Sequence, residues 1–83
     1  MRATVLVRPK PGILDPQGEA VRRSLQGLGY AAAEVRAGKV FDLDLDVGDA
    51  REAMKVAGRI AEQVLSNPLI EEFDVAVQEP ASV

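Results

Sequence analysis

The stretch VFDLDLDV, residues 40–47, decides the fold because its apolar and acidic residues alternate without a break. Side chains of a β-strand point alternately to the two faces of a sheet. One face of this segment therefore carries four apolar side chains, those of Phe41, Leu43, Leu45 and Val47. The other face carries three carboxylates, those of Asp42, Asp44 and Asp46. The pattern predicts a half-buried strand.

A helix and a further strand are predicted after this segment. Asp49 followed by Glu52 resembles a capping box, and an apolar stripe then predicts a helix over residues 49–65. The helix is expected to end before Pro68, which disfavours helical backbone in the residue preceding it. Residues 71–78, EEFDVAVQ, alternate as another strand, and residues 79–83 are expected to form a tail.

A strand and a helix are also predicted before the central stretch. Residues 3–8, ATVLVR, are apolar on both faces and predict a central strand, which ends at Pro9. Asp15 then provides a helix cap, and Pro16 fits the first helical position, where no N–H is needed. Gly29 is the expected C-terminal stop of a helix over residues 16–28.

Residues 31–36, AAAEVR, link this helix to the central stretch, and their position predicts a strand despite the helical propensity of alanine. Residues that pair directly across a hairpin share a face. Ala33 and Val35 are therefore expected beside Leu43 and Phe41. This register requires a loop of odd length, which is expected at residues 37–39 with Gly38 or its neighbour in the left-handed conformation, and a β-bulge would give the same parity.

The predicted order is strand, helix, strand, strand, helix, strand. With right-handed crossovers this order gives an α+β, ferredoxin-like sandwich, in which a four-stranded antiparallel sheet carries both helices on one face. The chain is expected to be a single domain over residues 1–83. The uncovered sheet face, with Thr4, Leu6 and Ala76, is expected to pack on a twofold copy of itself, and pairing through a strand edge is the alternative.

Composition excludes several function classes. The 83 residues include no cysteine, histidine or tryptophan, so thiolate sites, disulfides and the commonest general base are absent. The net charge of −3 argues against nucleic-acid binding. The chain shows neither a leader segment nor a membrane-spanning apolar run, so a soluble cytoplasmic protein without membrane attachment is expected.

No residue pattern predicts a catalytic or metal site. The three aspartates of residues 40–47 recur about 7 Å apart and could hold Mg²⁺ or Ca²⁺, but a solvated sheet face is the preferred interpretation. The serines have no histidine to activate them. Gly18 is unusual because glycine in the first turn costs a helix about 1 kcal/mol relative to alanine. It indicates either tolerance at a frayed end or the close approach of another chain's backbone.

The runs ILDPQGEAV (13–21), LGY (28–30) and VRAGK (35–39) resemble the PurS family, the small subunit of phosphoribosylformylglycinamidine (FGAM) synthase. The resemblance is specific over residues 13–39. The second predicted helix and the last predicted strand match the family only in their pattern of apolar and polar residues. It implies a non-catalytic subunit of a ligase in purine biosynthesis. That complex uses ATP with Mg²⁺ and glutamine to convert formylglycinamide ribonucleotide (FGAR) into FGAM.

The resemblance also implies the partners. The chain is expected to form a homodimer or a tetramer and to bridge the large synthetase subunit PurL and the glutaminase subunit PurQ, without binding a cofactor itself. The two segments 9–18 and 37–39 are expected to remain outside the core as rigid docking surfaces. The predicted interface residues are Lys10, Gly12, Asp15, Pro16, Gln17, Gly18, Arg36, Gly38 and Lys39.

Two other function classes remain open at this stage. ACT domains, which bind amino acids, share the predicted element order, and a regulatory small-molecule module is therefore the main alternative. A stand-alone enzyme would have to use Lys10 or Lys39, although a single lysine in a loop is more often a solvated charge or a partner contact.

Overall fold

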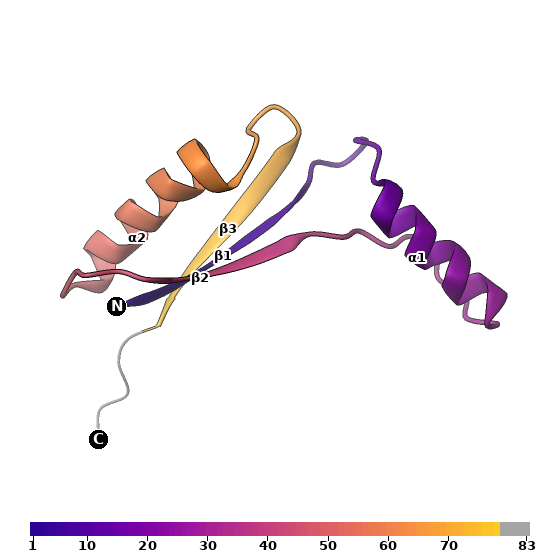
Figure 1. The fold of residues 1–83 in the computed structure, drawn as a ribbon, viewed down its shortest axis with the longest axis horizontal. Helices are drawn as coiled ribbons and strands as arrows, with labels where there is room; N and C mark the ends of the chain where they lie inside the picture. The colour runs from indigo at the N-terminus through magenta and orange to yellow at the C-terminus, as the bar shows by residue number, and fades with distance from the viewer. Residues whose placement is uncertain (79–83) are drawn as a thin grey trace, which may run out of the picture.

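The computed structural model describes residues 1–78 and contains one antiparallel sheet, two α-helices and a π-helical turn. The elements are, in chain order, β1 (Arg2–Pro9), α1 (Pro16–Gly27), β2 (Lys39–Asp44), α2 (Ala50–Ile60), η1 (Ala61–Leu65) and β3 (Glu71–Gln78). Figure 1 shows α2 against the sheet, whereas α1 projects beyond one end of it. The predicted tail, residues 79–83, lies outside the described residues.

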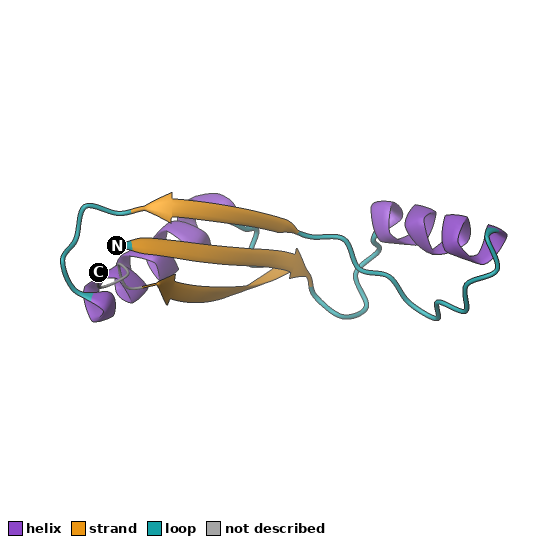
Figure 2. Cartoon of the chain, turned by 90° about the horizontal axis from the view of Figure 1, so that it is seen from below, coloured by secondary structure: helices purple, strands orange, loops and turns teal. Residues whose placement is uncertain are grey.

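β1 lies at the centre of the sheet, as its apolar sequence predicts. The strand order is β2-β1-β3, and both neighbours run antiparallel to β1 (Figure 2). Val5 is level with Phe41 on one side and with Val75 on the other. This register places one apolar row from each of the three strands on the same face, which α2 covers.

The core consists of small side chains. Six hydrophobic residues of the described chain are buried, three from β1 and three from the helical segment: Ala3, Val5, Val7, Ala53, Ala57 and Ala61. Three alanines in one helical stripe allow the helix axis to approach the strands closely. α2 packs on β3 and β1. The Asp49 carboxylate accepts a hydrogen bond of 2.8 Å from the Arg51 N–H, which confirms the predicted start of this helix.

The predicted fourth strand over residues 31–36 is wrong for the isolated chain. Phe41 and Leu43 pair with Val5 and Ala3 of β1, not with residues of the preceding segment. Within residues 1–78, no backbone–backbone hydrogen bond involves residues 31–36. The chain is α+β as predicted, but its sheet has three strands instead of four.

The predicted three-residue hairpin at 37–39 is wrong for a related reason. Among the described residues, positive φ angles occur only at Gly12 (85°) and Gly29 (92°), so Gly38 makes no left-handed turn. Gly38 instead allows the chain to pass close to the backbone of β1, because a β-carbon on Gly38 would lie 2.4 Å from the carbonyl oxygen of Val7. The chain therefore runs straight into β2 without reversing.

α1 forms as predicted, but not where the ferredoxin-like arrangement places it. Pro16 begins the helix, and Gly29 follows it with positive φ. With no hairpin at 37–39 to bring the segment back, α1 cannot lie on the sheet beside α2, and the molecule becomes flat and long, 48 × 34 × 14 Å. The prediction of two helices on one sheet face is therefore wrong for the isolated chain (Figure 1).

Over the described residues, the helices are too short or too polar for one of them to cross a bilayer.

Replacing Val5 by alanine tests the core. Val5 is 0% exposed, so Val5→Ala should lower the free energy of unfolding by about 2 kcal/mol, measured by urea denaturation. Val64, which is 74% exposed, provides the control, and Val64→Ala should change stability by no more than roughly 0.5 kcal/mol. Equal losses in the two variants would contradict this core.

Candidate functional site

The structure brings the two predicted docking segments together at the junction between the sheet and α1. The loop after β1 and the segment before β2 come from distant parts of the sequence, yet Asp15 in the first contacts Ala37 in the second. We call residues 30–38 the return segment, because they lead from the end of α1 back to the sheet. The candidate site is this junction.

Asp15 connects both segments through its two carboxylate oxygens. Oδ1 accepts a hydrogen bond of 2.9 Å from the N–H of Gly18, and Oδ2 accepts one of 2.8 Å from the N–H of Ala37. The first bond satisfies an otherwise free amide in the first turn of α1. The second attaches the return segment to the same side chain. Asp15 therefore fixes α1 relative to the sheet.

Pro9 explains why Ala37 needs this acceptor. The pairing of β1 with β2 ends at Val7 and Lys39, and Pro9 would be level with Ala37 in the next hydrogen-bonded pair. Proline has no N–H, so it ends the ladder. The Pro9 carbonyl accepts instead from the Arg36 guanidinium, which also lies 3.4 Å from a carboxylate oxygen of Glu72.

Gly18 is required by the packing of the junction. It is the buried residue of α1, and a β-carbon on it would lie 2.3 Å from the carbonyl oxygen of Val35. A backbone segment does approach Gly18 closely, but the expectation that it belongs to another chain is wrong. The approaching backbone belongs to the same chain, and the alternative of a tolerated glycine at a frayed end is wrong.

The hydrogen bonds at the junction lower the pKa of the Asp15 carboxyl below its ordinary value. The bond from the Gly18 N–H is the largest cause, followed by the bond from the Ala37 N–H, and the charge of Arg36 adds to both. All three favour the ionised form. At neutral pH the junction therefore contains a carboxylate that accepts two amide hydrogen bonds.

The predicted site residues divide into two groups. Asp15, Gly18 and Arg36 hold the junction together through the contacts just described. Five of the others are exposed at its surface, namely Gly12, Pro16, Gln17, Gly38 and Lys39. Lys10 is half-buried, and its N–H donates to the carbonyl of Ile70 at 2.9 Å. Gly38 lies at the point where the return segment joins β2.

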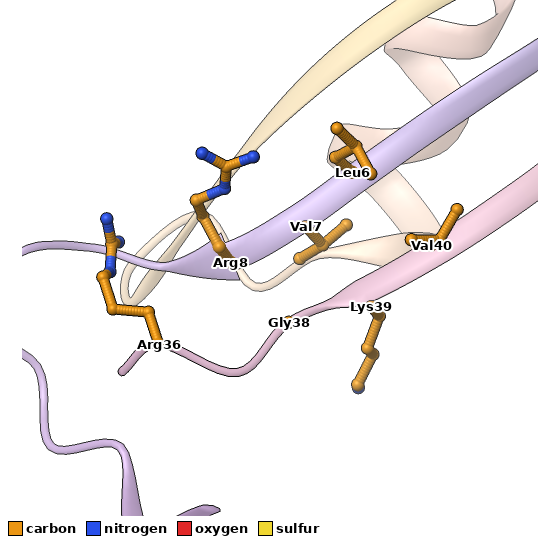
Figure 3. A pocket seen from close by; sticks show the side chains of 7 residues that line it. All are labelled: Leu6, Val7, Arg8, Arg36, Gly38, Lys39 and Val40. Carbon is orange, nitrogen blue, oxygen red and sulfur yellow. The ribbon is translucent and has the colours of Figure 1, made fainter. Parts of the chain in front are cut away.

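Two shallow hollows border the junction. One, of about 270 Å³, lies between the loop at 9–15 and the return segment at 33–36. The other, of about 330 Å³, lies at the start of β2, and Figure 3 shows the side chains that line it. There Leu6, Arg8, Arg36 and Val40 point to one side of the sheet and Lys39 points to the opposite side.

Sequence reasoning missed the exposed apolar side chains beside the site. Leu14 is 81% exposed, and Leu28 and Tyr30 at the far end of α1 are 75% and 63% exposed. The available signal at Leu14 was its place in a loop, after Pro9 and Pro11 and directly before the helix cap Asp15. Leu14 lies before the start of α1 and Leu28 and Tyr30 lie beyond its end, so they form two separate apolar sites and no single patch.

The aspartates of residues 40–47 form no metal site in the part of the chain that the structure describes. Asp42 accepts a hydrogen bond of 2.9 Å from the Thr4 hydroxyl, and Asp44 and Asp46 are exposed. Arg8, on the same face of the sheet, lies 3.9 Å from a carboxylate oxygen of Asp74 in β3.

Exchanging Gly18 for alanine tests the junction. Gly18→Ala should lower stability by about 1–3 kcal/mol, because the Val35 carbonyl must move away from the new methyl group. Gly27 lies in the same helix with no atom within 4 Å of an added β-carbon, and Gly27→Ala should instead stabilise by roughly 0.4–1 kcal/mol. Thermal unfolding followed by helical circular dichroism distinguishes the two, and equal effects would refute the close approach.

Acid should loosen the same junction. The folded pKa of Asp15 lies below its unfolded value, so its contribution to stability is present above the unfolded pKa and is lost as pH falls through the folded pKa. An NMR titration should show the amides of Gly18 and Ala37 shifting together in this acid range. Asp15→Asn should abolish that shared transition, whereas Asp46→Asn should leave it in place.

Comparisons with known proteins agree with the resemblance seen over residues 13–39. The model of the PurS family, described as phosphoribosylformylglycinamidine (FGAM) synthase, matches residues 2–79. The PurS subunit of FGAM synthase from Mycobacterium leprae is 42% identical over 77 residues, which cover 89% of this chain and 91% of that protein.

Solved structures share the fold as well. The crystal structure of PurS from Methanocaldococcus jannaschii superposes with a TM-score of 0.84 at 26% identity, over 96% of this chain and 98% of that chain. A chain in the structure of PurLQS from Thermotoga maritima superposes with a TM-score of 0.81 at 26% identity, over 90% and 93%. The predicted resemblance is confirmed and extends over nearly the whole sequence. The chain belongs to the PurS family, the PurS subunits of phosphoribosylformylglycinamidine synthase.

Proposed function

We propose that this chain acts as the non-catalytic adaptor of an FGAM synthase complex, joining the synthetase subunit PurL to the glutaminase subunit PurQ. The complex converts FGAR into FGAM with ATP, Mg²⁺ and glutamine, and the adaptor supports the transfer of ammonia between the two larger subunits. The similarity to a chain of PurLQS from Thermotoga maritima supports this assignment.

The projecting helix is the observation that carries the proposal. An adaptor must present surfaces to different proteins while holding them in a fixed relation. α1 stands beyond the end of the sheet and is fixed to it by the two hydrogen bonds of Asp15. Because the junction is already ordered, docking on it would cost little conformational entropy.

The chemistry of the chain agrees with an adaptor. It has no histidine or cysteine, so the side chains that most often act as base or nucleophile are absent from the sequence. The match to the PurS family over residues 2–79 favours this function over an amino-acid-binding regulatory module. We assign no cofactor to the chain itself and place the complex in the cytoplasm.

A homodimer is part of the proposal. The described residues leave both edges of a three-stranded sheet and one of its faces uncovered. A domain of this size buries only about 60% of the surface that its unfolded chain exposes, so association would add substantially to its stability.

Binding of the partner subunits tests the adaptor function. Leu14→Asp should weaken co-elution with PurL and PurQ in size-exclusion chromatography with ADP and glutamine, because it places a charge on the exposed loop of the junction. Val64→Asp alters a similarly exposed apolar residue on η1 and should leave co-elution unchanged. If Leu14→Asp assembles normally, this loop is not the docking surface. If the wild-type chain elutes apart from both subunits, the adaptor function is wrong.

A further inference from the structure

Three basic side chains form a row along the solvent side of α2. Arg51, Lys55 and Arg59 follow one another at intervals of four residues, and residues four apart lie on one face of a helix. Each of them precedes a buried alanine of the core by two positions, which is about 200° around the helix. The row therefore lies opposite the side of α2 that packs on the sheet. We call these three residues the basic row of α2.

The basic row is accessible in the part of the chain that the structure describes. All three of its residues are exposed. α2 lies against one face of the sheet, and α1 projects beyond the far end of the sheet instead of covering α2 (Figure 1). A hollow of about 330 Å³ lies along the same side of the helix, lined by Asp49, Arg51, Glu52, Lys55, Val56 and Arg59. A side chain of another molecule therefore has room to enter between the basic groups.

No carboxylate of residues 1–78 forms an ion pair with the row. The ion pairs in this part of the chain involve four other arginines. Glu52 lies three residues before Lys55 and Glu62 lies three residues after Arg59, a spacing at which helical ion pairs form, yet neither makes one. Three positive charges therefore gather on one side of a chain whose net charge is −3.

The basic row is unfavourable for α2 itself. Arg51 lies in the first turn of the helix, where a cation opposes the helix dipole. Lys55 has a like charge four residues before it and another four residues after it, and such pairs destabilise a helix. An acidic residue at position 55 would suit the isolated helix better. The stability of α2 therefore does not account for the row.

The spacing of the row matches a protein segment that carries carboxylates. A helix rises 1.5 Å per residue, so successive cations are about 6 Å apart along the axis and the whole row is about 12 Å long. Carboxylates four residues apart on a helix, or two residues apart on a strand, have nearly the same spacing. Arginine and lysine form strong, charge-assisted hydrogen bonds with such groups.

A nucleic acid is less suited to this surface. Affinity for nucleic acids rises with the number of phosphates that a protein neutralises, and three cations neutralise few. The open face of the sheet is acidic, because Asp42, Asp44 and Asp74 are exposed on it. That face and the negative net charge repel a long polyanion. A short acidic protein segment contacts the basic row alone and avoids the acidic face.

We propose that the basic row of α2 binds an acidic segment of a partner protein. The occupant is a run of aspartates or glutamates on one of the two larger subunits. The proposal rests on the adaptor function and gives the chemistry of one contact that the adaptor makes. α1 and its junction lie at the other end of the molecule, so they remain available for a second contact (Figure 1).

Reversing the central charge of the row tests this contact. Lys55→Glu places a carboxylate four residues from Arg51 and four from Arg59, so it should raise the midpoint of thermal unfolding of the isolated chain by a few degrees. The same substitution should weaken binding to PurL or to PurQ at least about tenfold, because like charges then meet across the interface. Calorimetric titration with each subunit separately, in the presence of ADP and glutamine at about 50 mM salt, measures this loss and identifies the subunit that carries the acidic segment.

Two matched variants control for charge and for side-chain shape. Lys55→Arg keeps the charge of the row and should bind like the wild-type chain. Arg2→Glu, at an exposed residue of β1, changes the net charge as much as Lys55→Glu and should bind within about twofold of the wild-type chain. Equal weakening by Arg2→Glu and Lys55→Glu would contradict the contact, since only the net charge would then matter.

The dependence on salt gives a second readout. Binding of the wild-type chain should weaken between about 50 mM and about 500 mM salt, and Lys55→Glu should show a smaller loss. If Lys55→Glu binds as tightly as the wild-type chain at low salt, the acidic contact is refuted and the adaptor function still stands. If the wild-type chain binds neither subunit, the adaptor function is wrong and the contact is wrong with it.

Discussion

The carboxylate of Asp15 holds the two parts of the molecule together. Pro9 ends the β1–β2 ladder because it has no N–H, and the Ala37 amide that follows in the opposite strand is left without a strand partner. One oxygen of Asp15 accepts that amide and the other accepts the amide of Gly18. The position of α1 therefore depends on a local polar contact rather than on burial of an apolar helix face, since Val21 is exposed and Leu25 is only half-buried.

The sequence was sufficient for the elements whose signals are local. The alternation at 40–47 and at 71–78 predicted strands that the structure contains, since side-chain period alone distinguishes a half-buried strand. Asp15 with Pro16 predicted the start of α1 at the correct residue, and the stripe of alanines predicted α2 on the core. Each of these signals acts within a few residues, so neighbouring elements do not alter it.

The misplaced elements depend on contacts that local patterns do not specify. A segment such as 31–36 has the same extended pattern whether its partner strand belongs to its own chain or to another one. Gly38 is compatible with a left-handed turn and equally with close contact to the Val7 carbonyl, and the structure uses the second. In the candidate site, Gly18 could be singled out from sequence as an unfavourable helix residue. Its neighbour, the Val35 carbonyl, lies on a distant segment that only the fold brings close.

An incomplete sheet suits a protein whose role is to assemble with others. The isolated chain buries little more than three β1 residues against three alanines of the helical segment. It also exposes large apolar side chains at both ends of α1. A partner that binds only the folded form stabilises that form in proportion to its concentration and affinity. A partner that covers the open edge or the projecting helix would therefore add to the stability of this fold. A fourth strand supplied from within the same chain would satisfy that edge permanently and close it to every other chain. The straight path of the chain through Gly38 leaves the edge of the sheet open. The hydrogen bonds of Asp15 at the same time hold α1 in a fixed position.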